Sequence, residues 1–429
     1  MAESASGSVS SGTVRVSFHG GVGVIGSSKI LLEQSGWRVL LDIGQDFHPG
    51  QGLFRGPVRY AMPRELAHRL RVGEAPRIPH LFATPWLRET GLPGGSDGRT
   101  AVFVSHCHLD HIGLAGFLDE SVPIFASPGT VRVAGALAEA GEGIRGVEPH
   151  ITAMEEGVPL EFGPFRVTRL DIDHDVVGAS GYRVETADGA LAFTGDFRFH
   201  GRHPERSFRF AERVKGVRAL VTEGTTLGFA PTMRVRTEED VDRDFERYVA
   251  ETPGLVLVTL YPRNLERVES FLRIANAKGR TVVWPDATAR FLTAYGLSEE
   301  TVRSFGTVGE KAIREHPEAF VLQVEIARFP DLFDLRVPIG SVFLHANGEP
   351  LGPYDPDWEL LQDWLKALAV PFVSIGTGGH AAPDALQEMV DRVSPDLLFP
   401  LHTTAPERLL PAPGKRRLLP AYGRTFSLA

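Results

Sequence analysis

The segment FVSHCHLDHIG, which begins at residue 103, constrains the fold more than any other part of this sequence. Three histidines, one aspartate and the chain's single cysteine lie within six consecutive positions at the end of an apolar run. Side chains two residues apart in extended backbone point to the same face, so we expect His106 and His108 to bind one metal ion together. Cys107 points the other way and is expected to pack behind the site as a small apolar residue.

Two further metal-binding side chains, Asp110 and His111, follow on the turn beyond this strand. Their position places them within reach of a second ion close to the first. A lone histidine is more often a hydrogen-bonded core or surface residue. This density of imidazole and carboxylate groups after an apolar strand instead favours a metal centre.

The rest of the sequence has the composition of an ordinary globular protein, with 42% hydrophobic and 23% charged residues among 429. Residues 1–13 are mostly small and polar and are expected to form a disordered tail, not a signal peptide. No apolar run approaches the roughly 18 residues of a membrane span, so we expect no membrane association. A single cysteine excludes an internal disulfide framework and favours a cytoplasmic location. The net charge of −9 argues against nucleic-acid binding by bulk charge alone.

A glycine pattern at Gly21, Gly23 and Gly26 matches the GxGxxG fingerprint of dinucleotide-binding proteins. In that fingerprint the glycines open a helix. Here they precede KILLEQ, a Ser-Gly turn and WRVLLD, which together predict a β-hairpin. We therefore expect the glycines to form a tight turn near the active face and expect no dinucleotide site.

The pattern of helices and strands divides the chain into two kinds of region. In residues 14–228 short strands alternate with turns, interrupted by an insertion at 48–100 that is rich in Pro, Gly and Arg and could form a rim or lid. Residues 229–371 read as a small parallel α/β unit, which starts with a capping box at Thr237. Motif-bearing loops return in residues 372–429 and are expected to complete the first domain.

The HCHLDH motif resembles the signature of the metallo-β-lactamase superfamily. Its fold is an αββα sandwich that binds up to two zinc ions. Three more residues match the other motifs of this superfamily in order: Asp42 at the end of WRVLLD, His174 in DIDHDVVGASGY and Asp196 in AFTGDF. The resemblance implies that Asp42 orients a ligand histidine from behind.

Beyond residue 200 the sequence also resembles the β-CASP branch of this superfamily, which processes nucleic acids. Glu223 in LVTEGTTLG, His380 in SIGTGGHAAPDAL and His402 in LLFPLHTTAPERL match its motifs A, B and C. The α/β unit lies between motifs A and B, where these enzymes insert their cap domain. A histidine at motif C is typical of the RNA-directed members, which are ribonuclease J-like or cleavage-factor-like. We therefore expect an α/β protein in which an αββα sandwich carries an inserted β-CASP cap.

The resemblance implies a set of ligands for two Zn²⁺ ions, with Mn²⁺ as an alternative occupant. One ion is expected to have only histidine ligands besides the bridging aspartate. His402 is expected to complete the ligand set of the other ion. The full set is His106, His108, Asp110, His111, His174, Asp196 and His402.

The implied reaction is hydrolysis of RNA phosphodiester bonds, from the 5′ end, internally or both, with single-stranded RNA as the expected partner. Two ions activate a water for in-line attack. His380, paired with Glu223, is the expected general acid for the leaving oxygen, and Asp110 is counted among the catalytic residues.

Three alternatives stay open at this point. The first is a DNA-directed β-CASP nuclease. The second is a hydrolase of small esters or thioesters, which would lack the inserted cap and the motif B histidine. The third is a non-catalytic RNA-binding subunit, but such subunits typically lose zinc ligands, and none is missing here. Homo-oligomer formation is also left open.

Arginines are concentrated after the fourth motif, which predicts contacts with substrate phosphates. Arg198 and Arg202 lie in the basic run GDFRFHGRHPERSFRFAERVKGVR, and Arg263 and Arg267 lie at the start of the cap. Such a run is more often a solvated face, so these four assignments rest mainly on their proximity to the motifs.

Overall fold

The structure is a computed structural model that describes residues 12–46, 63–229, 235–348, 355 and 357–429. The predicted hairpin is present. Strands β2 (Ile30–Gln34) and β3 (Trp37–Leu41) pair antiparallel on either side of the Ser-Gly turn. The glycine turn that precedes them opens no helix, because β2 follows it directly.

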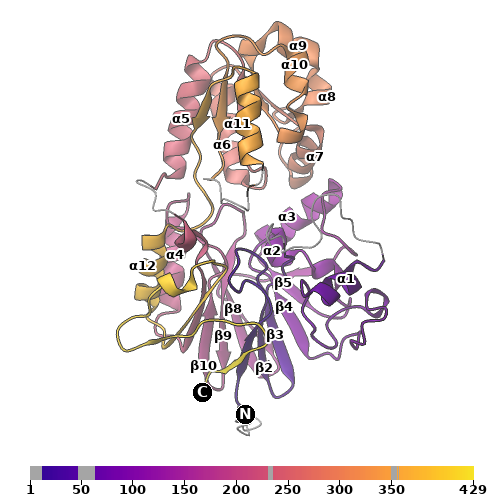
Figure 1. Ribbon diagram of the computed structural model, residues 1–429, viewed down its shortest axis with the longest axis vertical. Coiled ribbons are helices and arrows are strands. Elements are labelled where there is room, and N and C mark those ends of the chain that lie inside the picture. The colour runs from indigo at the N-terminus through magenta and orange to yellow at the C-terminus, as the bar shows by residue number, and fades with distance from the viewer. Residues whose placement is uncertain (1–11, 47–62, 230–234, 349–354, 356) are drawn as a thin grey trace.

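Two seven-stranded sheets form the lower part of the molecule (Figure 1). In spatial order, the first sheet contains β20 (Thr425–Ser427), β1 (Arg15–Phe18), β2, β3, β4 (Thr100–Phe103), β5 (Ile124–Ala126) and β6 (Ile151–Ala153). The second contains β19 (Arg416–Arg417), β18 (Leu397–Leu401), β11 (Ala219–Glu223), β10 (Gly189–Phe193), β9 (Ser180–Thr186), β8 (Phe165–Asp171) and β7 (Pro159–Phe162). Strands from the last part of the chain therefore complete both sheets.

The two sheets pack face to face because successive side chains of each strand point to opposite faces. In β4, Ala101 and Phe103 join the core between the sheets, whereas Val102 joins the core on the outer side. Tyr182 of β9 crosses from the second sheet to the first. Its ring lies 5.7 Å from that of Phe103, and its hydroxyl donates a hydrogen bond of 2.7 Å to the carbonyl of Val104.

Helices cover both outer faces of this sandwich (Figure 1). The first sheet is flanked by α1 (Glu65–Val72), α2 (Leu109–Ile112) and α3 (Pro128–Glu139), and the second by α4 (Pro204–Arg213) and α12 (Pro383–Val393). The layer order is the expected αββα arrangement, and the prediction of the fold class is confirmed.

A third, fully parallel sheet lies beyond one end of the sandwich (Figure 1). Its strands, in spatial order, are β14 (Arg303–Ser304), β13 (Thr281–Trp284), β15 (Phe320–Gln323), β12 (Val256–Thr259), β16 (Val342–His345) and β17 (Phe372–Ser374). Its helices are α5 (Glu238–Glu251), α6 (Leu265–Ala277), α7 (Asp286–Tyr295), α8 (Phe305–Val308), α9 (Glu310–Glu315), α10 (Asp331–Leu335) and α11 (Trp358–Ala367). We call this part of the molecule the cap.

The first helix of the cap begins as predicted. The Thr237 hydroxyl accepts a hydrogen bond from the Asp240 amide, and the Asp240 carboxylate accepts one from the Thr237 amide. The end of the cap differs from the expected boundary at residue 371, because β17 pairs with β16 in the cap sheet. We therefore propose that the cap ends after Ser374.

Two predicted regions fall partly outside the described residues. Of the predicted tail only residues 12 and 13 are described, and the carbonyl of Gly12 accepts a hydrogen bond of 3.1 Å from the Gln34 side chain. Of the insertion at 48–100, residues 63–100 are described. Leu66 and Leu70 of α1 are buried there in the outer core of the first sheet, so this part of the insertion belongs to the helical layer.

Candidate metal centre

Strand β4 and helix α2 position the histidine-rich segment. The backbone stays extended up to His108 (φ −67°, ψ 145°), which immediately precedes α2. His106 is fully buried. Cys107 is buried on the opposite side, in an apolar cluster that includes Leu137 and Val176. Burial raises the pKa of the Cys107 thiol to about 11, which suits a packing residue and not a metal ligand.

The structure brings all seven predicted ligands together although they are spread over almost 300 residues of sequence. Within each of two groups, the potential ligand atoms all lie within 4.8 Å of one another. The first group is His106, His108, His174 and Asp196, and the second is Asp110, His111, Asp196 and His402. Asp196 belongs to both groups, which is the position of a bridging ligand.

Short distances between ring nitrogens and carboxylate oxygens define the second group. The Nε2 atom of His111 lies 3.1 Å from Oδ2 of Asp196, and Nε2 of His402 lies 2.9 Å from Oδ2 of Asp110. In the first group, Nε2 of His106 is buried and has no hydrogen-bond partner among the described residues. A buried nitrogen without a partner is costly unless it binds an ion, so the donor set fits a metal centre.

Groups behind three of the histidines orient their rings. Nδ1 of His111 donates to Oδ2 of Asp42 at 2.7 Å, and Nδ1 of His174 donates to the carbonyl of Gly379 at 2.6 Å. Nδ1 of His402 is hydrogen-bonded to Oγ1 of Thr225 at 2.9 Å. In all three residues the other nitrogen, Nε2, therefore faces the ligand group.

The close contact between His174 and Gly379 requires a glycine. A Cβ atom at residue 379 would lie 2.6 Å from Cε1 of His174 and 2.7 Å from Cγ of Asp175. Asp42 (φ 61°) and His402 (φ 53°) also have a left-handed backbone conformation, which is uncommon for residues other than glycine.

The electrostatics of the first group suit metal binding. Burial, together with neighbouring histidines, lowers the pKa of His106 well below its usual value, and burial lowers that of His108 to about 3. Burial also lowers the pKa of His174. All three imidazoles are therefore neutral at physiological pH, which is the form that binds a metal ion.

In the second group the carboxylates favour a positive charge on His111. Burial opposes a charge on His111, but Asp196, Asp110 and Asp42 raise its pKa well above the usual value. Burial likewise opposes ionisation of Asp110 and Asp196, but His111 and His402 hold the pKa of both carboxyls well below the usual range. A metal ion that binds here displaces the proton from His111.

His380 and Glu223 form a pair beside the two groups. Nδ1 of His380 lies 3.0 Å from Oε2 of Glu223 and 3.7 Å from Oδ2 of Asp196. Burial disfavours a charged ring, but Glu223, with Asp196 and Asp175, raises the pKa of His380 to about 10. The amide of Phe197 donates to Oε1 of Glu223 at 2.8 Å and fixes its carboxylate. The imidazole therefore carries a proton that it can donate.

The prediction of phosphate contacts is wrong for Arg198 and Arg267. Their side chains are 1% and 2% exposed, and both donate to the carboxylate of Glu238, which is fully buried. Arg198 also donates to the carbonyls of His174 and Gly378. A cationic side chain is buried only when it is paired, and these two link the cap to the metal-binding loops instead of facing solvent.

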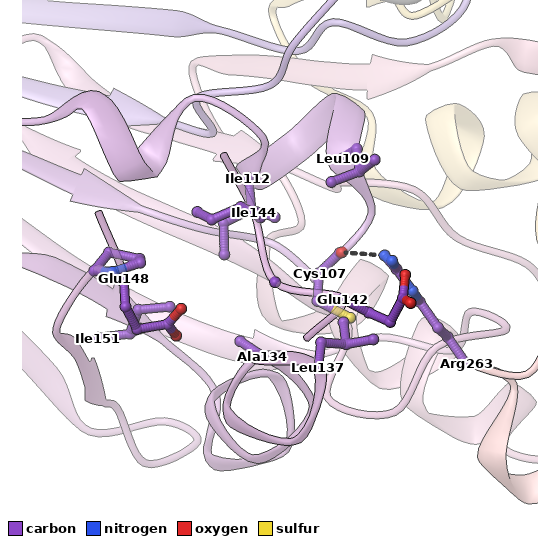
Figure 2. A pocket seen from close by; sticks show the side chains of 12 residues that line it. Cys107, Leu109, Ile112, Ala134, Leu137, Glu142, Ile144, Glu148, Ile151 and Arg263 are labelled. Atoms are coloured by element: carbon purple, nitrogen blue, oxygen red, sulfur yellow. Dashed lines mark hydrogen bonds between the residues drawn. The ribbon is translucent and has the colours of Figure 1, made fainter. Parts of the chain in front are cut away.

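The other two predicted arginines remain partly exposed. Arg202 donates two hydrogen bonds of 2.9 Å to the carboxylate of Asp242. Arg263 reaches from the cap to the histidine-rich segment, where its Nη1 atom donates to the carbonyl of Cys107 at 3.3 Å (Figure 2). The apolar pocket in this view is small, about 20 Å³, and lies on the Cys107 side of the segment.

Sequence reasoning missed two groups at the centre. Oδ1 of Asp175 lies 3.2 Å from Nε2 of His174 and 3.7 Å from Nε2 of His108. The ring of Tyr261, from the cap, lies 5.3 Å from that of His108. Asp175 directly follows a motif histidine and could have been suspected for that reason, whereas nothing in the sequence around Tyr261 indicates that it reaches this site.

Comparison with known proteins agrees with this geometry. Residues 80–241 match the family described as Beta-lactamase superfamily domain, and they include the predicted ligands from His106 to Asp196. A crystal structure of a protein of unknown function from Enterococcus faecalis V583 is similar over 97% of this chain and 100% of its own, with a TM-score of 0.79 and 25% sequence identity. The same arrangement of sandwich and cap is therefore found in another protein.

In sequence, the chain is similar to enzymes named Ribonuclease J. The Helicobacter pylori J99 protein is 22% identical over 92% of this chain and 56% of its own length. The Pyrococcus abyssi protein is 22% identical over 70% of this chain and 74% of its own length, and the Sinorhizobium meliloti protein is 29% identical over 71% and 58%. The chain thus spans little more than half the length of the Helicobacter relative. Among the described residues, no helix is long and apolar enough to cross a membrane.

Proposed function

We propose that this ribonuclease J-like chain of the metallo-β-lactamase superfamily is a metal-dependent ribonuclease that hydrolyses phosphodiester bonds of single-stranded RNA. One observation carries the proposal. The imidazole of His380 is paired with Glu223, and its Nδ1 atom lies 3.7 Å from Oδ2 of Asp196, the carboxylate shared by both ligand groups. A proton donor fixed beside a two-ion site is suited to an in-line displacement in which the leaving oxygen must be protonated.

The residues present fit two zinc ions, because imidazole nitrogens and carboxylates are their preferred ligands outside thiolate sites. His106, His108 and His174 would hold one ion and Asp110, His111 and His402 the other, with Asp196 between them. When bound, the two ions supply an ionised water and neutralise charge on the phosphodiester. Manganese remains an alternative occupant of the same groups.

The chain's own residues then carry the proton transfer. Oε2 of Glu223 holds Nδ1 of His380, so the Nε2–H of that ring is the proton donor for the leaving oxygen. After cleavage the imidazole is neutral, and it recovers a proton from solvent because its pKa is raised to about 10. Asp110, at 2.9 Å from His402, keeps its carboxylate ionised and accepts a hydrogen bond from the attacking water.

Arg263 and Arg202 are proposed as contacts to the RNA backbone. The guanidinium of Arg263 donates one hydrogen bond, to the carbonyl of Cys107, and makes no other among the described residues. Its remaining N–H groups are therefore available for a phosphate. Arg202 is already paired with Asp242, so its contribution is expected to be smaller. The proposed cytoplasmic location is supported by the single cysteine, which is a free thiol.

Cleavage of end-labelled oligonucleotides tests the function. Single-stranded RNA and DNA of the same sequence, each with a 5′-phosphate or a 5′-hydroxyl, are incubated with the zinc-loaded protein with and without a chelator. We expect RNA cleavage that stops when the chelator is added. A ladder of products distinguishes internal cleavage from release of mononucleotides from the 5′ end. Preferential cleavage of DNA would instead support the alternative hypothesis of a DNA-directed nuclease.

A matched variant separates this proposal from a hydrolase of small esters. His380→Ala is expected to lower RNA cleavage by about 10²- to 10⁴-fold, the usual contribution of a general acid. His380 and Glu223 also form a third cluster with Asp196, but the proposed ligands of the two ions do not include His380, so zinc content should stay close to two ions per chain. A His380→Ala variant that cleaves RNA at the wild-type rate, or a wild-type protein that hydrolyses only nitrophenyl esters, would refute the proposal.

A further inference from the structure

One loop of the cap reaches the metal centre. Strand β12 ends at Thr259, and the next five residues, 260–264, lead into α6. The side chain of Asn264 caps that helix by accepting from the Arg267 amide, and the Asn264 amide donates to the carbonyl of Tyr261 at 3.0 Å. Leu260 is buried in the cap core. The loop is therefore anchored by contacts at both ends.

Two contacts dock this loop on the histidine-rich segment. Nη1 of Arg263 donates to the carbonyl of Cys107, the residue between the two ligand histidines (Figure 2). The phenol ring of Tyr261 lies against the imidazole of His108 in an edge-to-face arrangement, with ring centroids 5.3 Å apart and an angle of 66° between the planes. Edge-to-face contact is a preferred geometry for such rings. Tyr261 thus touches a side chain of the first ligand group directly.

The hydroxyl of Tyr261 is an unused hydrogen-bond donor. It makes no hydrogen bond within the part of the chain that the structure describes, and Tyr261 is a partly exposed residue. Tyr182 shows the usual situation of an interior tyrosine, because its hydroxyl donates to the carbonyl of Val104 at 2.7 Å. A fixed donor left free beside a metal centre can stabilise charge on a substrate.

We propose that Tyr261 is a further catalytic residue, supplied by the cap, whose hydroxyl donates a hydrogen bond to a non-bridging phosphate oxygen of the bound nucleotide. This inference rests on the proposed action on phosphodiesters. The hydroxyl keeps its proton throughout, so no bond of Tyr261 forms or breaks. The cap would then contribute directly to the reaction and not only to binding of the nucleic acid.

The variant Tyr261→Phe tests the inference, because it keeps the ring against His108 and removes only the hydroxyl. Tyr248→Phe is the matched control, since Tyr248 packs on the cap core from α5. Three quantities are measured for both variants and the wild type. They are the zinc content by mass spectrometry, the affinity of the zinc-loaded protein for adenosine monophosphate by calorimetry, and kcat and KM on single-stranded RNA.

For Tyr261→Phe we expect an unchanged zinc content, about tenfold weaker binding of adenosine monophosphate, and a kcat about 10- to 100-fold lower, as for loss of one donor to developing charge. The control should match the wild type. If Tyr261→Phe retains wild-type nucleotide affinity and kcat, the inference is wrong while the ribonuclease proposal stands. Loss of zinc from this variant would also overturn it, because Tyr261 would then act by positioning His108.

The nucleotide-binding measurement separates this inference from the proposed function. If the wild type does not cleave RNA but binds adenosine monophosphate about tenfold more tightly than Tyr261→Phe, the hydroxyl contact is supported and the ribonuclease proposal fails. If the wild type neither cleaves RNA nor binds the nucleotide, both are refuted.

Discussion

Replacing Glu223 by glutamine tests the proposed proton donor most directly. The Glu223 carboxylate lies 3.0 Å from Nδ1 of His380 and is the main group that raises the pKa of this imidazole to about 10 against the effect of burial. At that distance and an effective dielectric constant of about 20, Coulomb's law gives an attraction of about 5 kcal/mol, or a factor of roughly 10⁴ in proton affinity. Glutamine has the same shape without the charge, so the pKa of His380 should fall towards the ordinary value of 6.5.

The sign of the effect on rate follows from the role of the group. A general acid must be protonated, so the cleavage rate falls as the pH rises through its pKa. At pH 8.5, an imidazole of ordinary pKa 6.5 is protonated in about 1 molecule in 100, so we expect Glu223→Gln to be about 100-fold slower than the wild type there, with a much smaller difference at pH 6. Cations bound at Asp196 lower the pKa of the imidazole in both proteins, which moves both pH profiles to lower pH and leaves the separation between them unchanged.

The assay is single-turnover cleavage of end-labelled RNA between pH 6 and pH 9.5. Glu161→Gln is the control, because Glu161 is an exposed carboxylate of β7. Zinc content is measured for each protein, so that loss of metal is distinguished from loss of the proton. If the rate of Glu223→Gln declines over the same pH range as that of the wild type, Glu223 does not set the protonation of His380 and the assignment of the acid is wrong.

Three other variants test the remaining parts of the structure. Asp196→Ala should lose most of its zinc in metal analysis, since this carboxylate is shared by both groups, and full retention would contradict the bridging role. Asp42→Asn should weaken zinc binding by about 10- to 100-fold in competition with a chelator, because the carboxylate orients His111, and wild-type affinity would refute that role. Glu238→Gln should lower the free energy of unfolding by about 3–5 kcal/mol in denaturant titrations, because two buried arginines lose the negative charge that balances them. A change below about 0.5 kcal/mol, the range of surface substitutions, would show that the network is not stabilising.

The sequence by itself determined the local elements and the chemistry of the main motif. The hairpin, the capping box at Thr237 and the burial of Cys107 follow from residue pattern and strand alternation, because each depends on neighbours a few positions away. The type of ligand was equally evident, since imidazole and carboxylate groups are seldom this dense without a metal ion. The αββα sandwich and the inserted cap were expected from resemblance to the superfamily, and the structure confirms that fold class.

Only the tertiary structure decided the role of each charged side chain. Arg198 and Arg267 read as surface cations in the sequence, but they are buried against Glu238, because folding brings the loop after β10 and the cap helices α5 and α6 to one point. The position of Tyr261 was also decided by the tertiary structure, because this residue lies 153 positions after His108 in the sequence and yet contacts its ring. Whether a charged side chain is buried, and which group it pairs with, depends on how distant segments pack. A sequence pattern predicts only the neighbours within the same strand or helical turn.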